Sequence, residues 1–238
     1  MNVDSIRLIT FDCYGTLIDW ETGMLRSLRP LFADAVRPIN DLELLELYGD
    51  VEAEIEAGEY LAYRQVLART VEEMGRRIGK PVSPDQAREF AQSLTEWEPF
   101  PDTVAALNRL AQRFKLGIIS NVDDDLFAAT HKKLRAPFEL IVTAQQVESY
   151  KPSLKNFQEA MRRCGLKPEA LLHAGQSVYH DIVPASFLGI ANVWVNRPSL
   201  RPGAGAAKPA VAQPTLEVGS MAELATALLG EDQHSLRP

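Results

Sequence analysis

The 238-residue sequence contains only two cysteines, Cys13 and Cys164, which excludes a disulfide-stabilised scaffold and fits a reducing compartment. It has no run approaching the ~18 consecutive apolar residues that a membrane-spanning helix needs. Its first residues also lack the basic region and apolar stretch of a secretory signal. We therefore expect a cytoplasmic protein that does not bind membranes.

Positive charge is in short supply, because 25 Lys and Arg residues face 32 Asp and Glu residues and the formal net charge is -7. An acidic surface repels phosphate backbones, so we expect no nucleic-acid partner. The apolar fraction of 46% is typical of globular chains, and this length can bury a core without disulfides or metals.

Short apolar, β-branched runs alternate with segments of helical periodicity, a pattern that favours a parallel sheet covered by helices on both faces. The predicted strands are Ile6–Phe11, Leu116–Ser120, Leu140–Ala144, Leu171–Ala174, Asn192–Val195 and Thr215–Val218. Helices are expected near 102–114, 124–134, 157–164 and 182–188, with a last one capped by Ser220. We predict an α/β fold with a Rossmann-like, doubly wound parallel sheet.

Residues 19–97 contain no convincing strand. Apolar stripes at helical spacing predict one helix over Asp41–Ala57 and another that ends at Gly79. Ser83 and Pro84 form a strong helix start. The sequence thus predicts a core of residues 1–18 and 98–238 with an inserted α-helical cap of residues 19–97. The Pro-, Ala- and Gly-rich stretch 197–214 is expected to be a loop, and the tail from Glu231 to be frayed.

Polar side chains follow several of the predicted strands, at the edge where open parallel sheets bind ligands. They are Asp12 and Thr16 after the first strand, Ser120 and Asn121 after the second, Lys151 after the third, and Gln176, Ser177 and Asp181 after the fourth. Lys151 is the single cationic candidate among them. We expect its ammonium to hold the Asp12 carboxylate ionised and oriented.

Four segments, Asp12–Leu17, Ser120–Asn121, Ser149–Pro152 and Gly175–Asp181, resemble in this order the four motifs of the haloacid dehalogenase superfamily. The insert after the first motif resembles the helical cap of that superfamily. The resemblance implies a hydrolase in which Asp12 is the nucleophile and forms a covalent aspartyl intermediate. It also implies catalytic roles for Lys151 and Asp181.

Two positions depart from the phosphatases of this superfamily, which carry acids where this chain has Tyr14 and Gln176. These acids serve as general acid and as magnesium ligand or its support. Their replacement argues against metal-assisted phosphoryl transfer. We therefore predict no metal site and no cofactor, with Mg²⁺ required only if a small-metabolite phosphatase, kept as an alternative, is correct.

The first motif, Asp-Cys-Tyr-Gly-Thr, resembles that of the 2-haloacid dehalogenase branch, and residues 11–23 resemble the azetidine-2-carboxylate hydrolase type still more closely. The resemblance implies displacement of a leaving group from the α-carbon of a small 2-substituted carboxylate, a halide in the first case and a ring nitrogen in the second. A ring nitrogen must be protonated, and the candidate proton donors are Tyr14, Tyr150, Tyr179 and His180.

Typical L-2-haloacid dehalogenases place a halide-receiving Arg in the first long cap helix, but Asp41–Ala57 contains none. Arg26, Arg29, Arg64 and Arg69 lie outside that helix, so Trp20 or a tyrosine would have to receive a halide. The residues expected to bind substrate are Tyr14, Thr16, Trp20, Ser120, Asn121, Gln176 and Ser177.

Several structural alternatives stay open. Asp12 and Lys151 would also suit a buried structural ion pair, and Asp181 would also suit the N-cap of the next helix. His131, His173 and His234 are expected to be structural or solvated. A non-catalytic carboxylate-binding protein is the alternative from a different functional class. The acidic face of Asp41–Ala57 is expected to be solvated, with a homodimer contact as the alternative.

Overall fold

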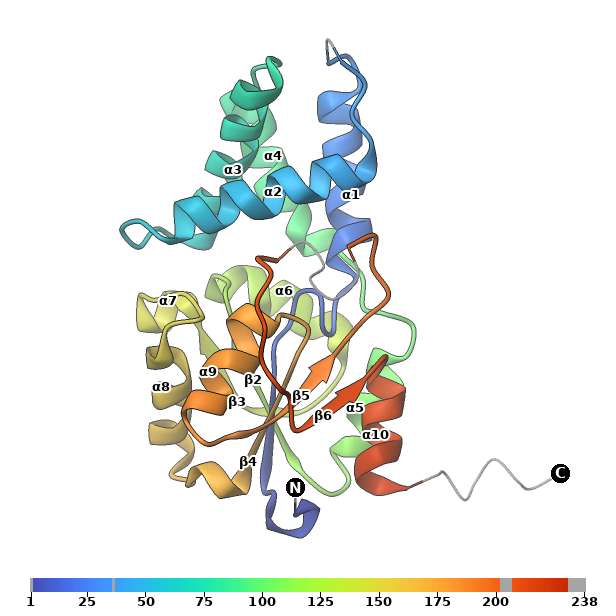
Figure 1. Cartoon of the computed structure of the whole chain (residues 1–238), viewed down its shortest axis with the longest axis vertical. Coiled ribbons are helices and arrows are strands. Elements are labelled where there is room, and N and C mark those ends of the chain that lie inside the picture. Colours follow the sequence, from blue (N-terminus) through green and yellow to red (C-terminus); the bar gives the residue numbers. More distant parts are fainter. Residues whose placement is uncertain (1, 36, 202–206, 231–238) are drawn as a thin grey trace, which may run out of the picture.

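A six-stranded, fully parallel sheet lies at the centre of the computed structural model, which describes residues 2–35, 37–201 and 207–230 (Figure 1). Its strand order is β3-β2-β1-β4-β5-β6. The strands are β1 (Leu8–Phe11), β2 (Lys115–Ser120), β3 (Phe138–Thr143), β4 (Leu171–Gly175), β5 (Ala191–Val195) and β6 (Leu216–Val218). The predicted doubly wound α/β fold is confirmed. The tail from Glu231 and residues 202–206 of the predicted loop lie outside the described residues.

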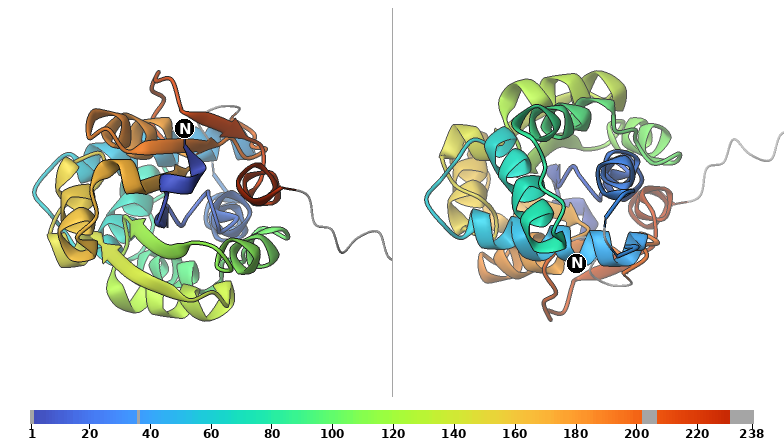
Figure 2. Two further views of the ribbon diagram at one scale, coloured as in Figure 1. Left: turned by 90° about the horizontal axis from the view of Figure 1, so that it is seen from below. Right: turned by 90° about the horizontal axis from the view of Figure 1, so that it is seen from above.

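Helices cover both faces of this sheet (Figures 1 and 2). One face carries α5 (Thr103–Leu110), α6 (Asp124–Leu134) and α10 (Met221–Leu229), whose apolar side chains join the larger hydrophobic cluster. The other carries α8 (Leu154–Cys164) and α9 (Val183–Phe187), which contribute to a second cluster. Side chains of β1 alternate between the faces, since Ile9 belongs to the first cluster and Leu8 to the second.

Four helices lie between β1 and α5 and stand over the carboxyl ends of the strands, with α2 lying across them (Figure 1). They are α1 (Trp20–Phe32), α2 (Asp41–Glu56), α3 (Tyr63–Ile78) and α4 (Pro84–Ser93). The start of α4 has the predicted form, because Ser83 and Gln86 make a reciprocal capping box. We call these helices, residues 20–93, the cap helices; the boundaries of the predicted cap domain stay a prediction.

The two chain crossings into and out of the cap helices pair with each other. Ile18 and Pro99 form an isolated antiparallel bridge, and the Asp19 N–H donates to the Glu98 carbonyl at 2.9 Å. Both crossings are therefore held at the loop that follows β1. The cap helices thus emerge next to the residues that follow the first strand.

A second attachment of the cap helices comes from the core. The buried Asp123 carboxylate, 3% exposed, accepts from the backbone N–H groups of Tyr63 and Arg64 at 2.8 and 2.9 Å and so caps the first turn of α3. The Tyr150 hydroxyl donates to the Leu61 carbonyl at 2.7 Å. These contacts hold the cap helices to the core at a second place, away from the crossings in the sequence.

The structure corrects the expected elements at several points. The sequence assigned no helix to Trp20–Phe32, yet α1 forms there with Asp19 as N-cap. A short helix, α7 (Ala144–Val147), separates β3 from Lys151. A π-helical turn, η4 (Val178–Ile182), precedes α9, so Asp181 lies inside a helical turn and Ser177 is the cap in its place. The remaining short 3₁₀ elements are η1 (Val3–Ser5), η2 (Leu94–Glu96) and η3 (Pro168–Ala170).

None of the helices formed by residues 2–35, 37–201 and 207–230 is both long and apolar enough to cross a lipid bilayer.

Candidate active site

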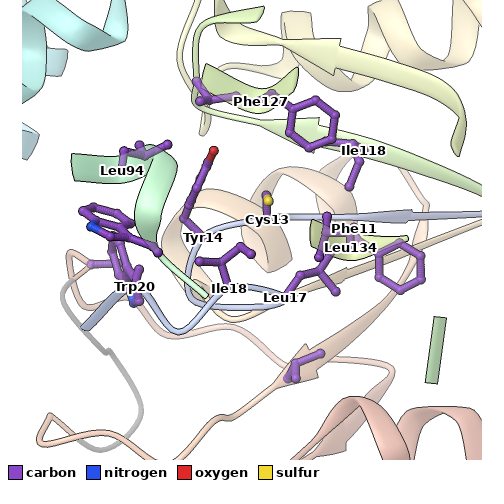
Figure 3. Packing of buried hydrophobic residues seen from close by; sticks show 14 of the residues in the cluster. Phe11, Cys13, Tyr14, Leu17, Ile18, Trp20, Leu94, Ile118, Phe127 and Leu134 are labelled. Atoms are coloured by element: carbon purple, nitrogen blue, oxygen red, sulfur yellow. The ribbon is translucent and has the colours of Figure 1, made fainter. Parts of the chain in front are cut away.

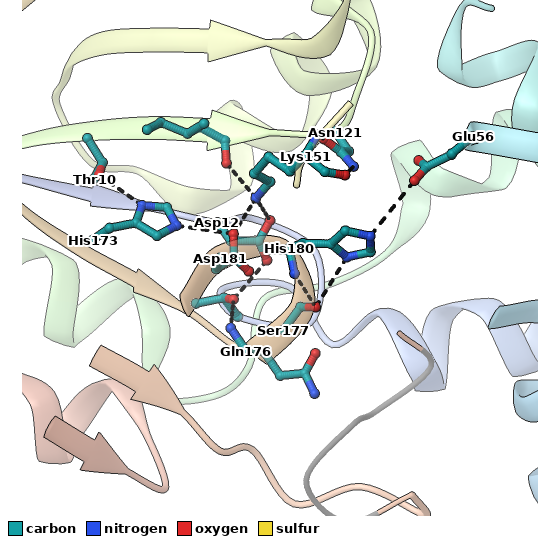
Figure 4. Close-up of polar contacts among 12 residues, drawn as sticks. Thr10, Asp12, Glu56, Asn121, Lys151, His173, Gln176, Ser177, His180 and Asp181 are labelled. Atoms are coloured by element: carbon teal, nitrogen blue, oxygen red, sulfur yellow. Dashed lines mark hydrogen bonds and ion pairs between the residues drawn. The ribbon is translucent and has the colours of Figure 1, made fainter. Parts of the chain in front are cut away.

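One ammonium group lies between two buried carboxylates at the carboxyl edge of the sheet (Figure 4). Lys151 Nζ donates to Asp12 Oδ1 at 2.8 Å, to Asp181 Oδ1 at 2.6 Å and to the Ile119 carbonyl at 2.9 Å. These three bonds use all three ammonium protons. Lys151 is 2% exposed and Asp12 8%, so the group is shielded from water. The pairing of Asp12 with Lys151 expected from the sequence is present.

The two carboxylates are compensated unequally. Burial alone would raise the pKa of Asp181. Lys151 and a hydrogen bond from His173 lower this pKa by more than burial raises it, so the net pKa is below the ordinary aspartate value. Burial also raises the pKa of Asp12, and here Lys151 does not fully offset the effect. Although burial lowers the pKa of Lys151, the two carboxylates raise it above its usual value. Asp12 is thus the more basic carboxylate of the pair.

The second oxygen of Asp12 is held by Thr16, whose hydroxyl donates to Asp12 Oδ2 at 2.8 Å. The Thr16 oxygen in turn accepts from the Gln176 backbone N–H at 2.8 Å. Both carboxylate oxygens are therefore fixed, and the loops after β1 and β4 are joined. Thr16 does not line the cavity described below, so it orients Asp12 and is not placed to bind substrate.

Lys151 is positioned through its backbone by Asn121. The Asn121 side chain accepts from the Lys151 N–H at 2.8 Å and donates to the Lys151 carbonyl at 3.2 Å. This two-point contact explains how a residue beyond α7 still reaches the end of β1. Asn121 therefore fixes the backbone of Lys151 and also lines the cavity.

Asp181 is supported by His173, a residue that the sequence analysis set aside as structural or solvated. His173 Nε2 lies 3.1 Å from Asp181 Oδ1, its Nδ1 lies 2.9 Å from the Thr10 hydroxyl, and the ring is fully buried. Glycine at position 175 is required for this arrangement, because a Cβ there would lie 2.4 Å from Asp181 Cγ. The alternation of side chains along β4 predicts which face of the sheet carries His173. It does not predict that Asp181 lies on the same face, because this depends on the helical turn after β4.

A cavity opens over Asp12 between the sheet edge and the cap helices. Nine of the ten residues expected at the site line it: Asp12, Tyr14, Trp20, Ser120, Asn121, Lys151, Gln176, Ser177 and Asp181. The structure therefore brings the expected residues together, while their catalytic and binding roles stay predictions. The Tyr14 hydroxyl contacts Thr130 of α6 at 2.9 Å, and its side chain packs among buried apolar residues (Figure 3). This hydroxyl is poorly placed to act as the proton donor considered above.

The other proposed proton donors are also occupied or remote. The Tyr150 hydroxyl donates to Leu61, and Tyr179 does not line the cavity. His180 does line it, and burial lowers its pKa to about 4. A neutral imidazole is therefore the form present near neutral pH, and Ser177 Oγ lies 3.2 Å from its Nδ1.

Arg197 is a second residue that the sequence analysis did not identify. Its guanidinium donates twice to the Thr16 carbonyl, at 3.0 and 3.1 Å, and pairs with Asp102 at 2.8 Å. It also lies 4.1 Å from the centre of the Phe100 ring. Arg197 thus ties the loop that carries Asp12 to the chain that returns from the cap helices.

The cap helices contribute two acids to the cavity, Glu52 and Glu56 of α2. The acidic residues of this helix were expected to form a solvated face. The alternation of apolar and acidic positions in α2 does not show that these two lie on the inner side. Arg64, one of the arginines considered as a halide receptor, pairs instead with Asp125 at 2.8 Å, and none of Arg26, Arg29, Arg64 and Arg69 lines the cavity.

The side chains at the site do not fit a magnesium ion. Asp12 and Asp181 both share Lys151, whose ammonium stands between them, and the Tyr14 hydroxyl is directed to Thr130. Within the described parts of the chain, no group of three or more His, Cys, Asp and Glu side chains is arranged to hold a metal ion. Mg²⁺ is commonly bound through one or two carboxylates with water completing its octahedron, and what opposes it here is that both carboxylates are already paired with Lys151.

Residues 6–189 match the model of a family described as haloacid dehalogenase-like hydrolase. One curated relative, the (S)-2-haloacid dehalogenase of Pseudomonas sp. (strain YL), is 25% identical and aligns over 82% of this chain and 84% of its own. Another, the glyceraldehyde 3-phosphate phosphatase of Methanothermobacter thermautotrophicus, is 29% identical over 80% of this chain and 86% of its own.

Solved structures give the same fold. The L-2-haloacid dehalogenase from Xanthobacter autotrophicus with chloropropionic acid covalently bound superposes with a TM-score of 0.78. The alignment covers 94% of this chain and 99% of that chain at 18% identity. Likeness at this identity shows a shared fold and leaves the reaction to be argued from the site.

Proposed function

The chain belongs to the haloacid dehalogenase-like hydrolase family, and from this premise we propose that it hydrolyses a small 2-substituted carboxylate through an ester on Asp12. The observation that carries the proposal is the buried Asp12 carboxylate, fixed through one oxygen by Lys151 and through the other by Thr16. A carboxylate held in this way is aligned and poorly solvated, which are the conditions that a weak nucleophile needs. The similarity to 2-haloacid dehalogenases at 25% identity supports the same reaction type.

In the proposed reaction an Asp12 oxygen forms a bond to the α-carbon while the bond from that carbon to the leaving group breaks, and the leaving group departs with the electron pair. Water then attacks the carbonyl carbon of the ester. The product is a 2-hydroxy acid, and one oxygen of the regenerated Asp12 carboxylate comes from water. Lys151 balances the charge of Asp12 before and after the ester stage, and Asp181 with His173 holds Lys151 in place.

Two leaving groups remain candidates at this point. A halide leaves as the anion and needs no proton. A strained ring amine that enters already protonated leaves as a neutral amine, and it takes up the proton released when water cleaves the ester. Both routes balance with water as the sole co-substrate, and neither needs a tyrosine to donate a proton.

The decisive experiment is a single turnover in ¹⁸O-water with enzyme in excess over 2-chloropropionate or azetidine-2-carboxylate. We expect the label to appear first in the Asp12 carboxylate, detected by mass spectrometry of the peptide that contains it. Asp12→Asn should be folded and inactive, whereas Asp50→Asn, at an exposed acid of α2, should retain activity. Label that passes directly into the product would rule out the ester.

A small-metabolite phosphatase is the second candidate, because one relative at 29% identity carries that name. Hydrolysis of p-nitrophenyl phosphate that disappears when a chelator is added would establish the phosphatase activity. It would also show that the site binds magnesium despite the pairing of both carboxylates with Lys151. A panel of chloro-, fluoro- and azetidine-type acids without turnover, together with a carboxylate that raises the melting temperature, would instead indicate a binding protein.

A further inference from the structure

Acidic side chains outnumber cationic ones in the lining of the cavity. Four carboxyl groups face it, from Asp12, Asp181, Glu52 and Glu56, against the single ammonium of Lys151. Among the described residues that line the cavity there is no arginine. His180 adds no charge near neutral pH, because burial lowers its pKa to about 4. Lys151 is already shared by the two aspartates, so the two glutamates have no cation of their own.

Glu52 is the more deeply set of the two glutamates and is 6% exposed. One of its carboxylate oxygens accepts from the hydroxyls of Tyr48 and Tyr63, at 2.7 and 2.8 Å. Burial raises its pKa, and these hydroxyls oppose the effect without supplying positive charge. Two hydroxyl donors on one oxygen fix the direction of the group, so Glu52 is a stationary acidic group behind Glu56.

Glu56 lies at the last turn of α2 and reaches toward the loop that follows β4 (Figure 4). Its side chain is 8% exposed, and its carboxylate stands 3.9 Å from His180 Nε2, too far for a hydrogen bond. Burial and then the charge of Glu52 raise the pKa of Glu56 well above the ordinary glutamate value, and the charge of Lys151 and a hydrogen bond with Asn121 only partly oppose this. An acid buried beside another acid is costly unless a positive group compensates it.

An independent observation points to a ligand in the same cavity. The Ser120 hydroxyl, on a side chain that is 2% exposed, has no hydrogen-bond partner among the described residues. Ser120 lines the cavity beside Asn121, at the end of β2. Buried hydroxyls are normally satisfied, so this oxygen is expected to bond to a bound molecule. It lies on the core side of the cavity, and Glu56 lies on the cap side.

From these contacts we infer that Glu56, backed by Glu52, is a subsite for a protonated amine, so that the substrate is a small amino or imino acid. The inference rests on the proposed function, since it names the substrate class of the same site. A purely anionic 2-haloalkanoate would bring a further negative charge to four carboxyl groups. A zwitterion instead places its ammonium at Glu56 while its carboxylate bonds to donors such as the Ser120 hydroxyl on the core side.

The test uses two probes of equal size that share a carboxylate, L-alanine and 2-methylpropanoate, which differ by an ammonium in place of a methyl group. Neither carries a strained ring or a halide, so binding is measured without turnover, by NMR titration of the protein at pH 7.5. We expect wild-type protein to bind L-alanine at least tenfold more tightly than 2-methylpropanoate. In Glu56→Gln this ratio should fall below threefold.

The matched control is Glu46→Gln, which makes the same substitution at an exposed position of the same helix and should keep the wild-type ratio. Calorimetry in buffers of different ionisation enthalpy provides a second measurement on the wild-type protein. L-Alanine should release more protons on binding than 2-methylpropanoate, because an ammonium beside Glu56 lowers the pKa that burial raises. The wild-type preference for L-alanine needs no variant, so its absence overturns the subsite even if Glu56→Gln fails to fold.

Equal binding of the two probes to the wild-type protein, binding of neither, or a preference that survives in Glu56→Gln would overturn the amine subsite. These outcomes are separate from the labelling of Asp12. If Asp12 is labelled during turnover of 2-chloropropionate and no amine preference exists, the proposed function stands and the subsite fails. If the preference depends on Glu56 but Asp12 acquires no label, the subsite stands and the ester mechanism fails.

Discussion

Lys151 compensates two carboxylates with one charge, so its removal should be felt in the folded state as well as in the reaction. In Lys151→Met, Asp12 and Asp181 would remain buried without a cation. We expect the free energy of unfolding, measured with urea, to fall by about 3–5 kcal/mol. Activity should be lost, because Asp12 would be protonated more readily.

The exposed Lys155→Met change, in the same stretch of chain, is the control and should leave the unfolding free energy within about 0.5 kcal/mol. Adding Asp12→Asn to Lys151→Met should recover part of the lost stability, since it removes one of the two uncompensated charges. A double variant no more stable than Lys151→Met would show that the ammonium acts by packing and not by charge.

Some residues of the site follow from the sequence pattern, and others do not. Asp12, Ser120 and Gln176 directly follow or end strands, and parallel strands end at one edge, so their meeting was predictable. His173 and Arg197 carry no motif, and they matter only because Asp181 and Thr16 are folded against them.

The close contact of α1 with Trp97, which follows the last of the cap helices, depends on a glycine. A Cβ at Gly23 would lie 2.4 Å from ring atoms of Trp97, which is 3% exposed. We expect Gly23→Ala to lower the free energy of unfolding by about 1–3 kcal/mol through overpacking, although alanine favours helices. The measurement is urea unfolding of both proteins.

Arg26→Ala tests the same helix on its exposed side and should change stability by no more than about 0.5 kcal/mol. If Gly23→Ala is as stable as the wild-type protein, the Trp97 ring has room to move and does not hold α1 in place. The Trp97 ring would then also be expected to turn, because its indole N–H has no partner among the described residues.

Elements with strong local signals were predicted well. The helix over Asp124–Leu134 was predicted with its observed limits, and Gly79 and Gly165 end helices as expected. The helix α1 was missed because Gly23 and Pro30 lie inside it and both disfavour helices. Its formation is decided by packing of Met24 and Leu28, which are fully buried in the larger cluster.

The stability of the whole molecule should depend on pH through its buried acids, and Glu56 should contribute in a defined direction. The pKa of Glu56 is raised by burial, so the folded state binds its proton more tightly than the unfolded chain does, where the ordinary value is about 4.5. The stabilisation is complete below that value and is lost as pH rises through the folded-state pKa. Glu56→Gln cannot show this loss.

We therefore expect the unfolding free energy of the wild-type protein, minus that of Glu56→Gln, to decrease as pH rises from 4 to 8 in urea titrations. Taking the difference cancels other groups, such as Asp181, whose lowered pKa acts in the opposite sense. A difference that stays constant with pH would mean that Glu56 titrates as it does in the unfolded chain.

The sequence by itself determined the α/β class, the succession of strands along the chain and the strand-end residues, because apolar periodicity and chain order are local properties. Only the tertiary structure decided that Glu52 and Glu56 face Asp12 instead of solvent. Which side of α2 is inner depends on how four helices pack over the sheet edge, through contacts such as Asp123 with the first turn of α3. Such contacts join residues some sixty positions apart, and no local pattern records them.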